Sequence, residues 1–197
     1  HLYTDNITQI IDSSWSPKTI SPLGRIIQTP ARYPFAGYKT SGSFYFDGVR
    51  GGMYVASPTS FNVGTGNYTI DFWAYDIRSA PDDSDILMID LDIEIYVNGG
   101  NLYLSAADTP DYRLSHVSLA TASTGWSHIA VTRNSGTLKV YVDGVSKTIV
   151  DDNGGGFAGK IITSTGELHI GSAMDAGFYY KGFLDEIRML KNKAAWT

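Results

Sequence analysis

The sequence contains no cysteine among its 197 residues. This absence excludes a disulfide framework, a thiolate zinc site and a cysteine nucleophile. Stability in an extracellular setting must therefore come from a hydrophobic core or from a bound metal ion.

Long apolar runs and an excess of positive charge are also missing. No window approaches the roughly 20 apolar residues that a membrane-spanning helix requires, so we expect no membrane insertion. Lysine and arginine number 15 against 20 acidic residues, which gives a formal net charge of −5. Nucleic acids are bound by clustered Lys and Arg, so nucleic acid is not an expected partner.

Glycine and alternating apolar residues are abundant instead. Hydrophobic residues make up 43% of the chain, and 21 residues are glycine, which is typical of a chain with a sizeable core and many turns. Side chains alternate as in half-buried strands over residues 68–75, 126–133 and 138–142. A further strand is expected over residues 182–189, and Asp143-Gly144 predicts a type I′ hairpin turn, in which both central residues need positive φ.

Repeated short strands of this kind predict an all-β fold, a sandwich of two antiparallel sheets. Ile70 and Phe72 should face the core, because burying one such side chain is worth roughly 1.5–3 kcal/mol. We expect His128 to be a packed or hydrogen-bonded strand histidine rather than a catalytic one. The segment near Leu2 is expected to join a sheet beside the strand at residues 183–189.

Four groups of segments carry a family resemblance, namely residues 43–48, 64–73, 126–133 with 141–144, and 182–188. Together they resemble the laminin G-like, concanavalin A-like jelly-roll family, in the version found in phage and other virion-surface proteins. The resemblance extends over essentially the whole chain, in order and at the usual spacing. We therefore expect residues 1–197 to form a single laminin G-like jelly-roll domain, excised from a larger protein.

The resemblance implies a non-catalytic recognition module that binds carbohydrate, for adhesion or attachment to a host surface. Its setting would be extracellular or on a virion surface. Its partners would be a glycan or cell-surface polysaccharide and neighbouring domains of the parent protein. A fold does not determine a function, so two alternatives stay open. One is a glycoside hydrolase of the laminarinase type, and the other is an architectural domain that decorates a viral fibre or capsid.

The hydrolase alternative depends on Asp90, Asp92 and Glu94. On one continuous strand over residues 86–97 these carboxylates would share a face, about 6.6–6.8 Å apart at successive positions. Laminarinases and lichenases have a Glu-x-Asp-x-Glu strand that this resembles, and retaining glycosidases use two carboxylates roughly 5–5.5 Å apart. Asp90 stands where the family nucleophile is Glu, and it is one methylene shorter. We therefore expect no catalysis and a solvent-exposed acidic strand whose other face turns to the core through Leu91, Ile93 and Ile95.

A structural calcium ion is a further implication of the resemblance. In several carbohydrate-active domains of this fold the aspartate that matches Asp185 helps to hold Ca²⁺. Calcium takes six to eight oxygen ligands, and Asp47 and Asp5 are the other expected carboxylate ligands. In the alternative interpretation, Asp185 only caps a turn.

The expected ligand-binding residues are Asp175, Phe178, Tyr179 and Tyr180, in the loop over residues 173–181. Sugars stack their C–H faces on aromatic rings, while a carboxylate accepts hydrogen bonds from their hydroxyl groups. Tyr179 and Tyr180 are equally compatible with packing on a neighbouring loop or on an adjacent subunit.

Overall fold

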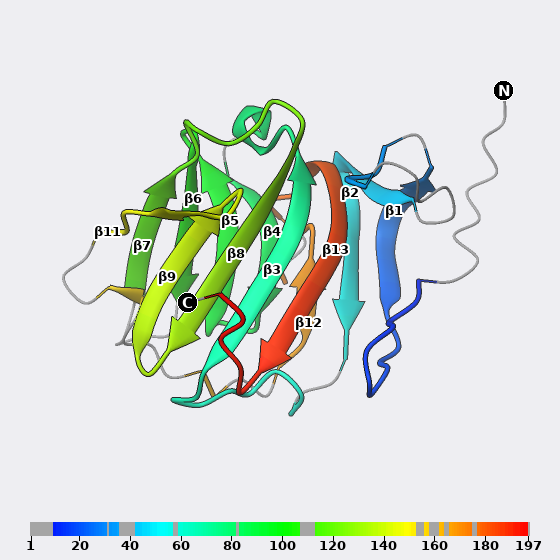
Figure 1. Cartoon of the computed structure of the whole chain (residues 1–197). Coiled ribbons are helices and arrows are strands. Elements are labelled where there is room, and N and C mark those ends of the chain that lie inside the picture. The colour runs from blue at the N-terminus through cyan, green and yellow to red at the C-terminus, as the bar shows by residue number, and fades with distance from the viewer. Residues whose placement is uncertain are drawn as a thin grey trace, which may run out of the picture.

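A computed structural model describes residues 10–30, 32–35, 42–56, 59–81, 83–106, 113–152, 156–157, 162–163, 166–174 and 177–196 (Figure 1). The expected all-β fold is confirmed, because strands dominate these segments and their helical residues belong to short 3₁₀ turns such as η1 (Ile77–Ser79). None of the described residues forms a helix long and apolar enough to cross a membrane. Leu2 lies outside the described residues, so its expected pairing stays a prediction.

The named strands pair antiparallel throughout. In chain order they are β1 (Ser21–Thr29), β2 (Ser43–Val55), β3 (Tyr68–Tyr75), β4 (Ser84–Ile89), β5 (Ile93–Asn98), β6 (Asn101–Ala106), β7 (Arg113–Ser118), β8 (Trp126–Asn134), β9 (Thr137–Val142), β10 (Val145–Lys147), β11 (Val150–Asp151), β12 (Leu168–Ile170) and β13 (Lys181–Lys191).

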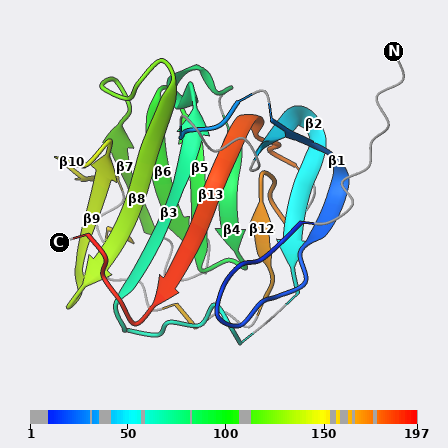
Figure 2. The same cartoon turned by 45° about the vertical axis from the view of Figure 1, so that its right-hand side comes forward.

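The strands form two layers that share β2 (Figures 1 and 2). The front sheet has the order β10-β9-β8-β3-β13-β2, and the back sheet continues as β2-β12-β4-β5-β6-β7-β11. Residues 44–47 of β2 pair with β13, whereas residues 53–55 pair with β12. One strand therefore belongs to both layers and makes a corner between them.

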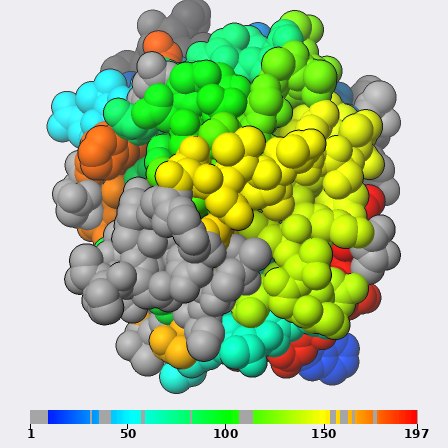
Figure 3. All heavy atoms as spheres, turned by 90° about the vertical axis from the view of Figure 1, so that its left-hand side faces the viewer, coloured from blue at the N-terminus to red at the C-terminus, as the bar shows by residue number. Residues whose placement is uncertain are grey.

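Strand β1 pairs along the other edge of β2, with a bulge between Gly24 and Ile26. Gly24 has φ +63°, and a Cβ at this position would lie 1.8 Å from the carbonyl oxygen of Arg50. Only glycine permits such a close approach of the two backbones. At the opposite side of the sandwich, the segment that contains β10 and β11 (yellow in Figure 3) links the two layers, because β10 pairs with β9 and β11 pairs with β7.

The core lies between the two layers and follows the alternation that the sequence predicts. Ile70, Phe72 and Ala74 of β3 are fully buried, as are Ile93 and Ile95 of β5. The predicted turn is also confirmed, since Asp143 and Gly144 have φ values of 52° and 76°.

The chain after β13 turns back across the outer surface of the front sheet (red in Figure 1). The Thr69 hydroxyl donates to the carbonyl of Lys193 at 3.0 Å and accepts from the Ala195 amide at 2.8 Å. The Thr132 hydroxyl donates to the Trp196 carbonyl at 3.2 Å. These threonines hold the C-terminal segment on β3 and β8.

The expected continuous strand over residues 86–97 is wrong. The chain turns over Asp90–Asp92 between β4 and β5, and the Asp92 amide donates to the Ile89 carbonyl at 3.1 Å. Asp90 adopts φ +49°, a left-handed conformation that Asp tolerates better than most residues. A hairpin therefore replaces the single long strand.

We expect the change Phe72→Ala to lower the free energy of unfolding by about 3–5 kcal/mol, because it empties a fully buried ring position. Urea titration followed by circular dichroism measures the loss. Val145→Ala is the control, since Val145 is 59% exposed, and its effect should stay within about 0.5 kcal/mol. Similar small losses in both variants would contradict the assigned core.

Candidate functional site

The carboxylates of the hydrolase hypothesis do not form a catalytic strand. Asp90 and Asp92 lie in the β4–β5 turn, and only Glu94 lies on β5. One Asp92 oxygen accepts the Thr163 amide at 2.8 Å, and Glu94 accepts a hydrogen bond from the Ser105 hydroxyl. The expected shared acidic face is therefore wrong. Leu91, expected in the core, is 49% exposed at the turn.

The expected calcium ligands are not assembled around one point. Asp47 caps a turn within β2, where its Oδ1 accepts the amides of Val49 at 2.8 Å and Arg50 at 3.1 Å. It pairs with Lys181, four residues from Asp185 along β13, which is about 13 Å at roughly 3.3 Å per residue. The shared role of Asp47 and Asp185 is therefore wrong. Asp5 lies outside the described residues, within which no three acidic or histidine side chains converge as a metal site would require.

Asp185 itself lies in an unusual setting. It pairs with Trp73 just before a bulge in β13, and Glu186 has φ +48°. The Asp185 side chain is buried, and this burial, with a smaller contribution from the charge of Glu186, raises its pKa to about 6, although the Glu186 amide hydrogen bond lowers it. Ionisation of a carboxylate in such a setting lowers the stability of the folded protein.

The predicted ligand loop divides its aromatic residues between core and surface. Tyr180 is fully buried and packs edge-on against Phe46, with ring centroids 6.1 Å apart. Gly171 makes room for this pair, because a Cβ there would lie 2.4 Å from the Phe46 ring. The expectation that Tyr180 presents its ring to a ligand is therefore wrong. Phe178 is 55% exposed, and Asp175 lies outside the described residues.

Tyr179 instead lines a groove of about 600 Å³, which we call the corner groove. It lies where β2 passes from one layer to the other, beside the bulged part of β1. Backbone contacts hold the base of the loop, since Phe178 accepts the Asp85 amide and Tyr180 donates to Gly171. The polar and aromatic side chains of the groove are those of Arg50, Tyr54, Glu167, His169, Ser172 and Tyr179.

The corner groove contains hydrogen-bonding groups that the protein does not fully use. His169 Nε2 lies 3.1 Å from Glu167 Oε2, and the imidazole stacks on Tyr54 across the β12–β2 pair. His169 Nδ1 and Ser172 Oγ are buried without a hydrogen-bond partner among the described residues. Such unpaired groups cost roughly 1–3 kcal/mol each. Both atoms are buried, and the polar groups of the lining that a ligand can reach directly are those of Arg50, Glu167 and Tyr179.

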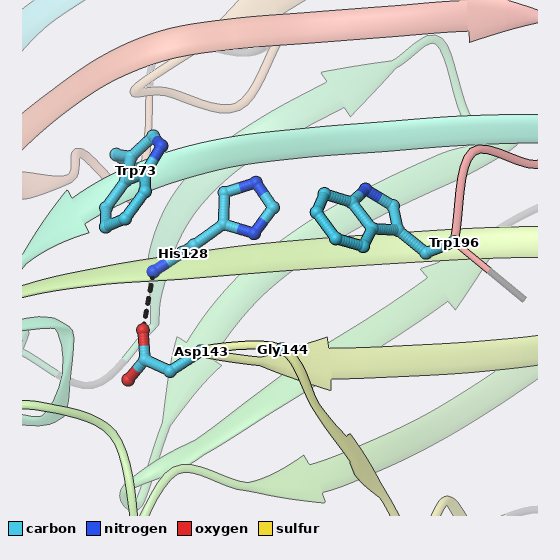
Figure 4. A pocket seen from close by; sticks show the side chains of 5 residues that line it. All are labelled: Trp73, His128, Asp143, Gly144 and Trp196. Carbon is cyan, nitrogen blue, oxygen red and sulfur yellow. Dashed lines mark hydrogen bonds between the residues drawn. The ribbon is translucent and has the colours of Figure 1, made fainter.

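A second concave region lies on the outer surface of the front sheet and measures about 420 Å³. We call it the aromatic hollow. Figure 4 shows the His128 imidazole between the indole rings of Trp73 and Trp196, with ring centroids 5.2 Å apart in both contacts. Asp143 and Gly144 complete the lining. The expectation that His128 is a packed strand histidine is confirmed.

Asp71 lies beside this hollow and contacts three of the side chains around it. Its carboxylate accepts two arms of the Arg188 guanidinium, at 2.7 Å and 3.1 Å, and the Trp196 indole N–H at 3.4 Å. His128 Nε2 lies 3.9 Å from the same carboxylate. Burial raises the pKa of Asp71, but the contacts with His128 and Arg188 outweigh this effect and hold its pKa below the usual value.

Sequence reasoning missed both concave regions, since the residues in each come from distant strands. A partial signal existed for the hollow, because alternation places Trp73 and His128 on outer faces of their strands. The same alternation aligns a row of four rings across the front sheet, with neighbouring centroids 4.9–6.1 Å apart. The row consists of Trp126, Tyr75, Phe183 and Tyr45.

Comparisons with known proteins identify the family. The profile of the laminin G-like family of the concanavalin A-like lectin/glucanases superfamily matches residues 47–194. The chain therefore belongs to this family, as its resemblance predicted. A search of curated protein sequences found no match.

Solved structures with the same fold include binding domains of botulinum neurotoxins. The serotype D binding domain superposes with a TM-score of 0.65 at 13% identity, covering 97% of this chain and 47% of that one. The neurotoxin DC binding domain, solved with rat synaptotagmin II, gives 0.66 at 14% identity, with coverage of 94% and 46%. The chain thus spans about half the length of these toxin binding domains.

A domain of a carbohydrate-active enzyme has a more similar length. Domain 4 of AbnA, an extracellular arabinanase from Geobacillus stearothermophilus solved with arabinotriose, gives a TM-score of 0.58 at 17% identity, covering 88% of this chain and 81% of that one. These similarities show the shared fold.

We expect Asp185→Asn to stabilise the protein by about 2 kcal/mol at pH 7. An unfolded aspartate titrates near pH 3.9, whereas folded Asp185 titrates at about 6. Between these values the folded state keeps a proton that the unfolded state has lost, so wild-type stability falls as the pH rises. Urea titrations of both proteins in chelator should show the gain at pH 7 and its disappearance below about pH 4. Equal differences at both pH values would indicate a packing effect and contradict the assignment.

Calcium binding at Asp185 stays a prediction, and it has an opposite signature. A metal that binds only the folded state at 100 times its Kd adds about 2.7 kcal/mol. If Asp185 is a ligand, Ca²⁺ raises the melting temperature of the wild type and leaves Asp185→Asn unchanged. Identical melting curves of the wild type in Ca²⁺ and in chelator would contradict calcium binding at Asp185.

Proposed function

We propose that this chain is a non-catalytic carbohydrate-recognition module whose binding site is the corner groove. The observation that supports this proposal most directly is the composition of the groove. Tyrosine rings lie there beside a cation, a carboxylate and two buried polar groups without partners among the described residues. Glycan sites combine ring faces with fixed donors and acceptors in this way.

The arrangement assigns a role to each kind of group. Tyr179 offers an aromatic surface to the C–H face of a sugar. Exposed Arg50 donates to hydroxyl or carboxylate oxygens, and Glu167 accepts from hydroxyl groups. Glu167 also orients His169 through the contact at Nε2, which makes Nδ1 the acceptor in the neutral tautomer.

The family and the structural neighbours support a binding function over catalysis. The arabinanase domain was solved with arabinotriose, and one toxin study concerns interaction with two ganglioside molecules. In this chain, the turn at Asp90–Asp92 separates the carboxylates that a laminarinase-type mechanism would need. We propose an extracellular module, on a virion surface or in another adhesive protein, that attaches a larger assembly to a glycan-bearing surface and contacts neighbouring domains of its parent protein.

We expect Tyr179→Ala to weaken glycan binding about fivefold, since an aromatic contact contributes on the order of 1 kcal/mol beyond simple burial. Calorimetric titration with arabinotriose and with hits from a glycan array measures the change. Tyr179→Phe should retain most of the affinity, because the ring remains. Tyr103→Ala is the matched control, as its ring stacks on Tyr96 at 5.0 Å, away from the groove.

Three outcomes of this experiment differ in meaning. Loss in Tyr179→Ala alone supports the corner groove. Equal loss of affinity in Tyr179→Ala and Tyr103→Ala, each checked for folding by circular dichroism, would show that the binding site lies outside the corner groove. Absence of any hit on a broad array would overturn glycan recognition and favour the architectural alternative.

A further inference from the structure

The aromatic hollow differs chemically from the corner groove. Three of its five lining residues have aromatic rings, namely Trp73, His128 and Trp196. The rings follow one another at 5.2 Å with interplanar angles of 51° and 52°. A group resting over His128 therefore meets indole rings on two sides (Figure 4).

The carboxylate oxygens and one indole N–H of this lining are engaged within the protein. Asp143 Oδ1 accepts the His128 amide at 2.8 Å, and Oδ2 accepts the Ser127 hydroxyl at 3.1 Å. The Trp196 indole N–H donates to Asp71. A sugar needs several hydrogen-bond partners in its site, and the Asp143 carboxylate and the Trp196 indole N–H already have partners within the protein.

Asp143 is the acidic side chain in the lining of the hollow. The Arg188 guanidinium forms a bidentate pair with Asp71, and the two charges offset one another. Asp143 lines the hollow, and its hydrogen bonds come from the His128 amide and the Ser127 hydroxyl rather than from a cation. Aromatic faces together with a carboxylate favour a cation that is weakly hydrated and needs no hydrogen bond.

We propose that the aromatic hollow binds a quaternary or fully methylated ammonium group. Such a group lies within about 6 Å of ring centroids in cation–π contacts, and its methyl groups pack on the indole surfaces without requiring acceptors. Asp143 supplies the opposite charge at the rim.

The hollow is held in place before any ligand binds. Thr69 and Thr132 fix the C-terminal segment on the sheet, and Asp71 orients the Trp196 indole. Asp143 is fixed by its type I′ turn and by its bonds to β8. A preorganised site of this kind loses little entropy on binding.

The test uses choline as the probe, with 3,3-dimethyl-1-butanol as its neutral isostere. Tryptophan fluorescence and calorimetry on the whole chain should show choline binding at least about tenfold tighter than the isostere, since only the charge differs. Trp196→Leu keeps an apolar side chain but removes the π face, and it should weaken choline binding about three- to tenfold. Asp143→Asn keeps an acceptor for the His128 amide and should weaken binding several-fold through loss of charge.

Trp15→Leu is the matched control, because Trp15 is fully exposed and does not line the hollow. Unchanged affinity in this variant with loss in Trp196→Leu supports the proposal. Equal binding of choline and its isostere, or choline binding that survives both Trp196→Leu and Asp143→Asn, would overturn it, as would the absence of choline binding.

Two sources of the same group are then separated by further probes. Tighter binding of phosphocholine than of trimethyl-lysine indicates a headgroup or a phosphocholine-substituted glycan, whereas the reverse indicates a methylated protein. These measurements do not depend on the corner groove, so glycan binding there and choline binding here succeed or fail separately.

Discussion

The period-two alternation of β3, paired between β8 and β13, is the constraint on which both faces of the front sheet depend. Its inward residues Ile70, Phe72 and Ala74 are completely buried, so a slip of one residue would expose this apolar face to solvent. The same alternation points Asp71 and Trp73 outward, where they pair in register with Arg188 and His128. The core thus fixes the positions of the residues that form the outer surface.

Asp71 holds the side chains that surround it on the outer surface of the front sheet. A buried carboxylate without partners is costly, and here Arg188, Trp196 and His128 surround it. Removing one partner would leave the charge of Asp71 only partly compensated. The pair with Arg188 therefore contributes more to the choice of one conformation than to net stability. Because Trp196 belongs to the C-terminal segment, the carboxylate links the end of the chain to the middle of the sheet.

The sequence predicted those features that depend on local pattern. The strands expected over residues 68–75, 126–133, 138–142 and 182–189, the core face of β3 and the Asp143-Gly144 turn follow from neighbouring residues. These predictions are confirmed. The turn at Asp90–Asp92 was missed, because an alternating acidic and apolar pattern also fits a continuous strand. A positive φ at Asp90 decides between the two structures, and the hydrogen bond of Asp92 to Thr163 depends on a contact distant in sequence.

The candidate sites were less predictable than the fold for the same reason. Tyr179 and Tyr180 are adjacent and chemically alike, yet one lines the corner groove and the other packs on Phe46. Successive residues in extended chain point to opposite sides, but which side is the core depends on how β2 and β12 meet. The space that Gly171 leaves for Phe46 helps to decide the outcome.

The two concave regions differ in one property that long-range packing determines. In the corner groove, the fold leaves polar atoms of His169 and Ser172 without partners among the described residues. In the aromatic hollow, it engages the oxygens of Asp143 and the indole N–H of Trp196. The two proposals follow from this difference, since the first invokes hydrogen bonding and the second invokes charge. Aromatic rings are common to both regions, so the state of their polar neighbours is the reason that we propose a sugar for one region and a methylated cation for the other.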